Sequence, residues 1–424
     1  MNGNKFNLKS DFSRNVLTLF TGTAIAQAIP ILISPILTRL YSPNDFGIFS
    51  AYLAIVSILG LFATWKFELA IPLEKEDCTA EIIFRIAIFI SIIMVIVYGI
   101  GMIIFKDYIN NIIDIPFTNY TIISILAGVF AIGIYQVYNY WYIRKKNFLI
   151  ISQSKVLKTL VMAVIQLVSG FIQPGFASLV FGDVLGRGTG NSPLFYMKKR
   201  SINKASFKTI FLLLKKYRKF LLFTGPAYLL NSLSFYITPL ILISLYGSEI
   251  SGYFSLSQRI IGLPIILIGQ TISQVYYNQA SALIRQGVSL YELYSRVVKK
   301  LFLFSVIPAI ILLFFGRNIF QIIFGNQWAQ AGLFAQIMAI PYLLRFIVNP
   351  VSQTLLIIKK QNIQFYWDIS RVILIVIIFY FCKINVLDAY ITVGIYSFGM
   401  MIMYLVQYFI MKKYIKSYES DINR

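Results

Sequence analysis

The chain contains no histidine and only two cysteines, Cys78 and Cys382, among its 424 residues. Histidine is the usual proton carrier near neutral pH, so in its absence any proton relay has to use carboxylates. Two isolated cysteines provide neither the ligand spacing of a metal site nor a disulfide framework. The chain also lacks the sequence G-x-x-x-x-G-K-[ST], which binds nucleotide phosphates. We therefore expect no metal, no cofactor and no ATP hydrolysis by the chain itself.

Acidic residues are scarce as well. The 16 carboxylates stand against 38 lysines and arginines, which gives a net charge of +22, and 58% of the residues are hydrophobic. A basic balance can indicate nucleic-acid binding, but here the basic residues are spread between apolar runs and are not gathered on a polar domain. We interpret them as topology signals beside anionic lipid and expect no nucleic-acid partner.

Twelve apolar runs fill nearly the whole chain, and each is close to the length that crosses a bilayer. A hydrocarbon core of ~30 Å needs roughly 17–25 apolar residues in a helix. Backbone groups in lipid must be paired within the segment, and barrel strands would be shorter and alternating. The sequence therefore predicts an all-α polytopic membrane protein with about 12 transmembrane helices. The predicted spans are 15–37, 46–65, 82–105, 119–143, 150–172, 174–197, 221–245, 252–274, 299–316, 330–357, 367–383 and 387–411.

Basic residues lie almost entirely in every second gap between these runs. With the N-terminus placed inside, 28 lysines and arginines fall in inner gaps and four fall in outer gaps. Cytoplasmic loops carry such an excess, so we expect both termini to lie in the cytoplasm.

The second half of the chain repeats the first at an offset of about 205 residues. Phe-Thr-Gly at 20–22 recurs at 223–225, and Gly-Ile-Phe-Ser at 47–50 corresponds to Gly-Tyr-Phe-Ser at 252–255. Six spans in each half would make the halves parallel repeats. We therefore predict three parts. They are an N-terminal lobe (1–197), a cytoplasmic amphipathic linker (198–220) and a C-terminal lobe (221–424).

The linker carries a helical apolar pattern. Phe207, Ile210, Phe211, Leu214 and Tyr217 fall on one helix face, and basic residues lie mainly around the other. This pattern predicts a helix in the membrane interface. The alternative is a plain basic loop.

Ionisable residues inside membrane spans are costly and usually functional. Arg259 and Arg345 have no carboxylate close by in their own spans, so each must face a wet cavity or a partner on another span, and we favour the cavity. Lys155 and Lys158 lie toward the inner end of their span and either line the cavity mouth or extend to lipid headgroups. The substrate-binding candidates are Arg187, Arg259, Arg345, Lys155 and Lys158.

Several charged residues are candidates for gating or ion coupling. Asp183 precedes Arg187 by four residues and Asp368 precedes Arg371 by three, so each pair is either a structural ion pair or part of the machinery. Lys66 near Glu68 offers the same two alternatives. The gating or coupling candidates are Arg39, Asp45, Lys66, Glu68, Asp183, Asp368 and Arg371.

Several stretches have a familiar form. Leu37–Gly47 (LTRLYSPNDFG) resembles the first-loop motif of bacterial polysaccharide transporters, and Phe67–Pro72 (FELAIP) resembles their R-Y-E-L-A-I motif. Lys66 stands where arginine is usual, which keeps the charge but not the two-pronged geometry. Gln279–Ser281 is similar to their Q-x-A-S element, and Phe324–Gln353 is similar to their span 9–10 region.

These transporters belong to the multidrug/oligosaccharidyl-lipid/polysaccharide exporter superfamily, and the O-antigen flippase branch is the most similar. The resemblance implies two six-helix lobes around a central cavity that opens to each side in turn. It implies an undecaprenyl-diphosphate-linked oligosaccharide as substrate, for O-antigen, lipopolysaccharide or a related surface polymer. It also implies the bacterial cytoplasmic (inner) membrane as location, with polymerase and chain-length proteins of the same pathway as partners.

We therefore predict a flippase for a lipid-linked oligosaccharide and not an enzyme. Arginine suits this role because it keeps its charge and engages two phosphate oxygens at once. A proton or sodium gradient, or consumption of the product, would drive transport. One alternative is a multidrug exporter of the same fold, which would place acids in its cavity. Another is a membrane polymerase or glycosyltransferase, which would need a large extramembrane loop or an acidic metal motif.

The basic bias makes the topology testable by reporter fusions. Fusions after residues 146, 205 and 420 should report a cytoplasmic location, and fusions near 110, 248 and 385 should report an external one. A cytoplasmic signal near residue 110 would contradict the predicted register of the spans.

Overall fold

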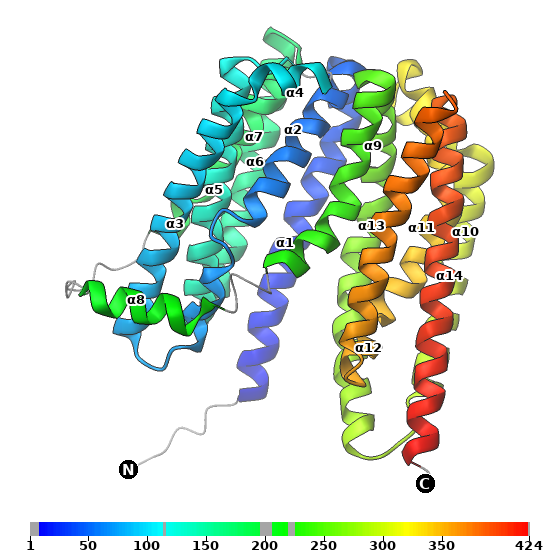
Figure 1. The fold of residues 1–424 in the computed structure, drawn as a ribbon. Coiled ribbons are helices and arrows are strands. Elements are labelled where there is room, and N and C mark those ends of the chain that lie inside the picture. The colour runs from blue at the N-terminus through cyan, green and yellow to red at the C-terminus, as the bar shows by residue number, and fades with distance from the viewer. Residues whose placement is uncertain (1–7, 113–115, 196–205, 219–224, 423–424) are drawn as a thin grey trace. The chain divides into compact units, whose positions relative to one another are not determined.

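The protein is all-helical in the residues that its computed structural model describes, 8–112, 116–195, 206–218 and 225–422 (Figure 1). Among these residues, ten helices are long and apolar enough to cross a membrane. One of the ten, α9, contains two predicted spans and bends at Gly247, whose φ of 83° suits glycine. The predicted sixth span corresponds to α7, which has 15 residues and is shorter than the 18 residues required of the ten helices counted above. Helices thus occupy at least part of each of the twelve predicted spans in the described residues.

The chain divides by packing into two units, 1–41 with 51–232 and 42–50 with 233–424. The predicted limits of the linker stay a prediction, because 196–205 and 219–224 lie outside the described residues. The elements of the first unit, with the start of α2 assigned to the second, are α1 (Leu8–Leu40), α2 (Pro43–Leu61), η1 (Phe67–Leu73), α3 (Asp77–Ile104), α4 (Lys106–Ile112), α5 (Asn119–Arg144), α6 (Phe148–Ile172), α7 (Phe176–Gly190), η2 (Ser192–Phe195) and α8 (Phe207–Lys216).

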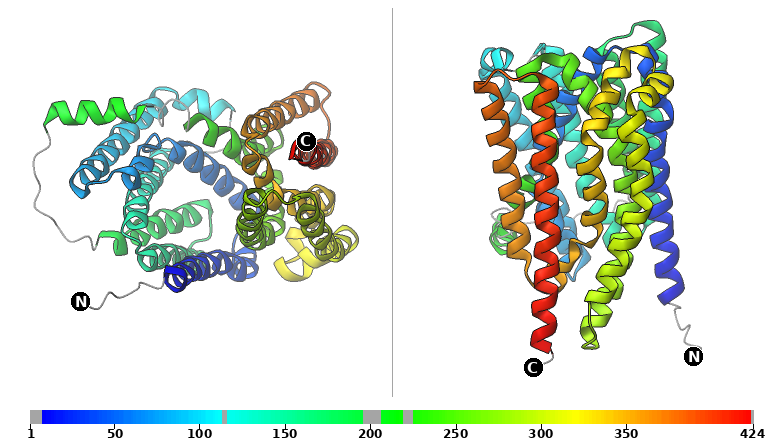
Figure 2. Two further views of the ribbon diagram at one scale, coloured as in Figure 1. Left: turned by 90° about the horizontal axis from the view of Figure 1, so that it is seen from below. Right: turned by 90° about the vertical axis from the view of Figure 1, so that its right-hand side faces the viewer.

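The second unit contains the remaining helices, and α13 and α14 lie side by side in it (Figure 2). The large exposed side chains of its helices are mostly apolar, as expected of surfaces that face hydrocarbon. Its elements are α9 (Gly225–Arg285), α10 (Tyr291–Phe324), η4 (Asn326–Trp328), α11 (Ala329–Val351), α12 (Gln353–Ile357), α13 (Gln361–Ile384) and α14 (Ala389–Ile422).

Three helices of the second unit extend well beyond their predicted apolar spans. The span 252–274 continues as helix to Arg285, 299–316 belongs to a helix over 291–324, and 387–411 continues to Ile422. A helix needs apolar residues only where it meets lipid, and its polar ends remain helical when they pack on one another. The extensions do so around a separate core that includes Tyr276, Leu290, Tyr294, Met411 and Ile415.

The prediction of a helix through residue 65 was wrong. Helix α2 ends at Leu61, and the chain then turns through Trp65 and Lys66, whose φ values of 49° and 59° lie in the left-handed region. The indole Nε1 of Trp65 donates to the sulfur of Met94 at 2.9 Å, which secures the turn. A short 3₁₀ helix, η1, then leads to α3.

The repeated Gly-x-Phe-Ser segments pack against each other within the second unit. A Cβ atom on Gly47 would lie 1.7 Å from the carbonyl oxygen of Ser248, and one on Gly252 would lie 1.9 Å from that of Pro43. The offset of 205 residues relates Gly47 to Gly252 and also relates Pro43 to Ser248. The contact is therefore reciprocal, and each glycine makes room for the backbone of the other segment.

Replacing either glycine should destabilise the protein. Because Gly47→Ala or Gly252→Ala would place a methyl group against a backbone carbonyl, we expect a loss of at least about 1–3 kcal/mol. The midpoint of thermal unfolding in detergent measures the effect. Gly101→Ala is the matched control, because no atom lies within 4 Å of its added Cβ. Equal midpoints for Gly47→Ala and Gly101→Ala would show that the glycine contact is not needed.

Candidate functional site: a cationic cavity and its supports

The first unit encloses a cavity of about 370 Å³ between α1, α5, α6 and α7. Three of its lining residues are cations that the sequence singled out, Lys155, Lys158 and Arg187. The lining also includes Gln27 and Asn191 as neutral polar groups. The volume is in the range of small-molecule pockets, and the structure thus brings three of the five predicted binding residues to one place.

The contact of α6 with α7 sets the geometry of this cavity. Gly182, Gly186 and Gly190 recur at every fourth residue of α7, and a Cβ on Gly186 would lie 2.7 Å from the carbonyl oxygen of Lys158. Small residues in this spacing let two membrane helices approach closely. The sequence analysis missed this glycine series, although its i, i+4, i+8 spacing is visible in the sequence.

Asp183 and Arg187 form the ion pair that their spacing allowed. The Nε atom of Arg187 lies 2.6 Å from Oδ2 of Asp183, and the hydroxyl of Tyr52 donates to the same oxygen at 3.2 Å. Asp183 is only 1% exposed. Lys158 lies close enough to interact electrostatically with both members of the pair. Lys155 donates to the hydroxyl of Thr23 at 3.0 Å. Lys158 and Arg187 lie near Asp183, and no described acidic residue lines the cavity beside the three cations, so it has an excess of positive charge and attracts anions.

Lys66 and Glu68 meet at the turn between α2 and α3. Their charged atoms lie 3.8 Å apart, and Glu68 is 1% exposed. Oε2 of Glu68 accepts from the hydroxyl of Thr64, which also lies 3.1 Å from the amide oxygen of Gln136. Oε1 accepts no hydrogen bond among the described residues. Oε1 is the oxygen that faces Nζ of Lys66, so the ion pair that the sequence allowed is present, and burial with few hydrogen bonds is costly for this carboxylate.

In the second unit two of the predicted arginines, Arg345 and Arg371, lie over aromatic rings. The guanidinium of Arg345 lies 5.3 Å from the ring centre of Phe235 and 5.6 Å from that of Tyr342. That of Arg371 lies 4.7 Å from the ring of Trp367 and 3.0 Å from Asp368. The negative face of an aromatic ring attracts a cation and stabilises it where it is buried.

Three predicted residues do not join these clusters. Asp45 accepts from both the backbone and the hydroxyl of Ser42 and thereby begins α2, which is a capping role. Arg39 is exposed and bonds the carbonyl oxygen of Pro35 in its own helix. Arg259 is not in an ion pair with any described carboxylate. The described residues also contain no cluster of acids or cysteines that could hold a metal.

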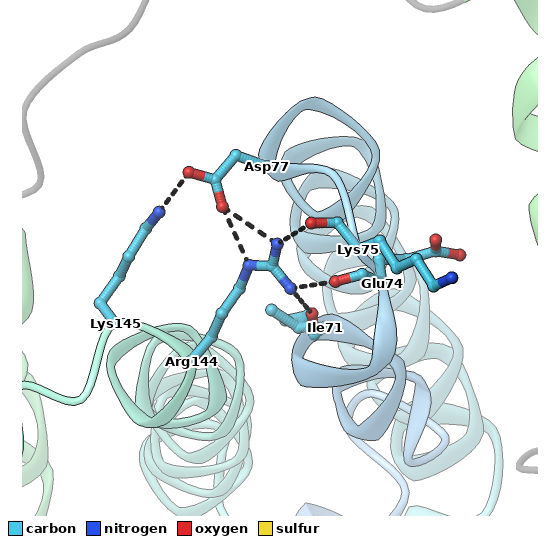
Figure 3. Close-up of polar contacts among 6 residues, drawn as sticks. All are labelled: Ile71, Glu74, Lys75, Asp77, Arg144 and Lys145. Carbon is cyan, nitrogen blue, oxygen red and sulfur yellow. Dashed lines mark hydrogen bonds and ion pairs between the residues drawn. The ribbon is translucent and has the colours of Figure 1, made fainter. Parts of the chain in front are cut away.

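Arg144 is a support that the sequence analysis counted only as a topology signal. Its guanidinium donates to the carbonyl oxygens of Ile71, Glu74 and Lys75 and twice to Oδ1 of Asp77 (Figure 3). Lys145 completes the site at 2.6 Å from Oδ2 of Asp77. The end of α5 is thereby tied to the whole segment between η1 and α3. The signal in the sequence was the acidic stretch Glu74–Asp77 on the same predicted side as Arg144 and Lys145.

Helix α8 is tied to the same segment. Lys216 lies 2.5 Å from Oε1 of Glu74, and the hydroxyl of Tyr217 donates to that oxygen at 2.7 Å. Burial acts to raise the pKa of Glu74, but the hydrogen bonds from Lys216 and Tyr217 outweigh it and hold the pKa below its ordinary value. Glu74 is therefore ionised at neutral pH, and the link between α8 and the segment is charged.

Comparison with known proteins gives consistent results. A family model for polysaccharide biosynthesis proteins matches residues 36–333. The teichuronic acid biosynthesis protein TuaB of Bacillus subtilis (strain 168) is 23% identical over 254 residues, which is 58% of this chain and 51% of that protein. The chain thus matches about half the length of this relative.

Solved structures share the fold. The lipid II flippase MurJ in an inward closed conformation has a TM-score of 0.73 at 15% identity, over 94% of this chain and 87% of that chain. An inward-facing MATE family multidrug resistance transporter has a TM-score of 0.68 at 15% identity, over 94% of each chain. These likenesses confirm the predicted fold of two six-helix bundles.

The hydrogen bonds of Arg144 should contribute measurably to the stability of the protein. Arg144→Lys keeps the charge, but its three donors can replace at most three of the five hydrogen bonds. Two lost bonds at roughly 0.5–1.5 kcal/mol each predict a loss of about 1–3 kcal/mol. Thermal unfolding in detergent measures it. Arg85→Lys is the control, since Arg85 is half-exposed and contacts only Glu81 among the described residues. Equal stabilities of the two variants would contradict the supporting role of Arg144.

Proposed function

The chain belongs to the polysaccharide biosynthesis protein family, and from this premise we propose that it is a flippase for a lipid-diphosphate-linked oligosaccharide. The observation that carries the proposal is the cationic cavity of the first unit, which Lys155, Lys158 and Arg187 line without any described acidic residue. The cavity is too small for a whole glycan and suits a group of the size and charge of a diphosphate. The substrate would move from the cytoplasmic to the outer leaflet of the bacterial cytoplasmic membrane by alternating access.

Arg345 and Arg259 of the second unit would contact the same anionic headgroup or acidic sugars at another stage of passage. The guanidinium of Arg345 lies over the rings of Phe235 and Tyr342, and its fork of donors can bind two oxygens of an anion. Polymerase and chain-length proteins that use the flipped product would be its partners.

Glu68 is our candidate for coupling to a proton or sodium gradient. Asp183 is also buried, but it is held by Arg187 and Tyr52, whereas Oε1 of Glu68 lacks a hydrogen-bond donor among the described residues. A carboxylate with an unsatisfied oxygen gains most from a proton or a cation. Transport without a gradient, driven by consumption of the product, is the alternative.

A multidrug exporter is the second candidate, because MATE transporters share the fold. The sign of the cavity charge argues against it for cationic drugs, since like charges repel. An enzyme of the same pathway is a third candidate, and the described residues offer it neither a metal cluster nor a large extramembrane domain.

Neutralising the cavity tests the flippase. Lys158→Gln removes a positive charge without leaving a carboxylate unpaired, because Arg187 still holds Asp183. A lost hydrogen bond to a charged group is worth about 1.5–3 kcal/mol, so binding of undecaprenyl diphosphate to the purified protein should weaken roughly tenfold or more. In cells, lipid-linked oligosaccharide should accumulate on the cytoplasmic side. Arg345→Ala should impair export as well, and Arg345→Lys should rescue it in part.

The control is Arg317→Ala, which changes an exposed cation on α10 and should export normally at an equal protein level. Normal export and normal binding in Lys158→Gln and Arg345→Ala would rule out the cationic-cavity mechanism. Resistance to cationic drugs that depends on the protein would favour the multidrug exporter.

A further inference from the structure

Helix α8 presents a mixed face of cations and large apolar side chains to the outside. Phe211 is 61% exposed and Leu212 is 55% exposed, and Lys208 and Lys215 lie on the same face. No acidic residue occurs in Phe207–Lys216. Adjacent apolar residues of this size are rarely left in water beside cations unless the surface has a partner.

The opposite face of α8 is already occupied by the protein. Leu213 and Tyr217 are buried in the core of the first unit, and the ring of Tyr217 meets that of Phe67 edge-on at 6.3 Å between centres. The sequence analysis expected Phe211 on the apolar face, but packing turns the helix so that Leu213 is inside and Phe211 is outside. The exposed face is therefore not needed for the fold of the unit.

The orientation of α8 suits a membrane surface. In Figures 1 and 2 it runs across the direction of α3, whose apolar length makes it a membrane-crossing helix. A helix perpendicular to the crossing helices lies in the plane of the membrane. The chain forms transmembrane helices on either side of it, with α7 before and α9 after. The helix thus stays near the lipid headgroups, on the side that the basic residues mark as cytoplasmic.

We propose that α8 is a peripheral membrane-binding helix whose outer face docks on anionic lipid and whose inner face clamps the segment from η1 to α3. Phe211 and Leu212 insert at the boundary between the headgroups and the acyl chains, and Lys208 and Lys215 contact lipid phosphates. An acidic soluble protein would complement the charges of Lys208 and Lys215. It would not provide the apolar environment that a bilayer offers to Phe211 and Leu212. The proposal does not depend on which lipid the protein transports.

The clamp has a consequence inside the unit. Phe67 and Ile71 of η1 pack in the same core as Leu213 and Tyr217, and Phe67 separates Lys66 from Glu68 in the chain. Lys216 and Tyr217 hold Glu74 at the other end of η1. A lipid-bound α8 therefore holds the segment that contains the buried carboxylate of Glu68.

The test places a cysteine at the proposed contact in the full-length protein. Phe211→Cys in a Cys78→Ser background is labelled with an environment-sensitive fluorophore and reconstituted into vesicles. Vesicles of phosphatidylcholine with phosphatidylglycerol should shift the emission to shorter wavelength and allow quenching by brominated lipid. The shift should be smaller with phosphatidylcholine alone or at high salt, because salt screens surface charges. Val288→Cys, an exposed turn residue between α9 and α10, is the control and should remain water-like.

A charge reversal separates lipid recognition from simple hydrophobic contact. Lys208→Glu with Lys215→Glu should abolish the difference between the two lipid compositions while leaving the buried face, and thus folding, unchanged. Emission at position 211 that stays water-like in anionic vesicles would overturn the proposal and would favour an acidic protein partner. Equal shifts in both vesicle types would overturn anionic-lipid recognition.

A second measurement tests the clamp. Glu74→Gln removes the charged link between the segment and α8, so hydrogen exchange over residues 67–73 should become several-fold faster. The double lysine reversal should accelerate the same exchange in anionic vesicles. Unchanged exchange in both variants would overturn the clamp, even if α8 binds lipid.

Discussion

A backbone carbonyl that leaves a helix near the membrane must find another donor, and much of the first unit is arranged around one such place. Helix α2 ends at Leu61, and the chain does not return to a long helix until Asp77. A buried backbone carbonyl without a donor is costly, so non-helical backbone that is packed inside the protein needs partners that the protein supplies. Arg144 supplies them for Ile71, Glu74 and Lys75 from the end of α5.

The break also creates the opportunity for function. A continuous helix would place Lys66 and Glu68 on its surface, whereas the left-handed turn at Lys66 directs Glu68 into the core beside Thr64. The packing of this non-helical segment inside the protein leaves its backbone in need of partners, and the same packing keeps the carboxylate of Glu68 buried. Thr64 and Lys66 hold Glu68 itself, and Arg144 and Lys216 hold the segment that follows it.

Much of the fold could be predicted because a bilayer requires each crossing segment to be a long apolar helix. Helix number follows from apolar length, and the cations inside spans indicated the cavity that joins Lys155, Lys158 and Arg187. The predictions were wrong where tertiary packing determines the local conformation. The turn at Trp65 depends on Met94 of α3, and the rotation of α8 depends on the core that receives Leu213. Periodicity in a single segment contains no information on either partner. Arg144 was missed for a related reason, since a cation at a helix end has the same pattern whether it faces water or caps a neighbouring loop.

The two units hold their cations in different ways, and this difference bears on mechanism. In the first unit Lys155 and Lys158 have flexible stems, and each is restrained by few polar contacts, as in the single bond from Lys155 to Thr23. In the second unit Arg345 and Arg371 are fixed by aromatic rings. A flexible lysine follows an anion that moves, at a cost in side-chain entropy, whereas a stacked arginine binds an anion only in one geometry. Counted from the first residue of their helices, Lys158 in α6 and Arg371 in α13 are both the eleventh. The corresponding helices therefore carry a cation at the same position along their length. Lys158 lies beside the pair of Asp183 and Arg187, whereas Arg371 is paired with Asp368 and lies over the ring of Trp367.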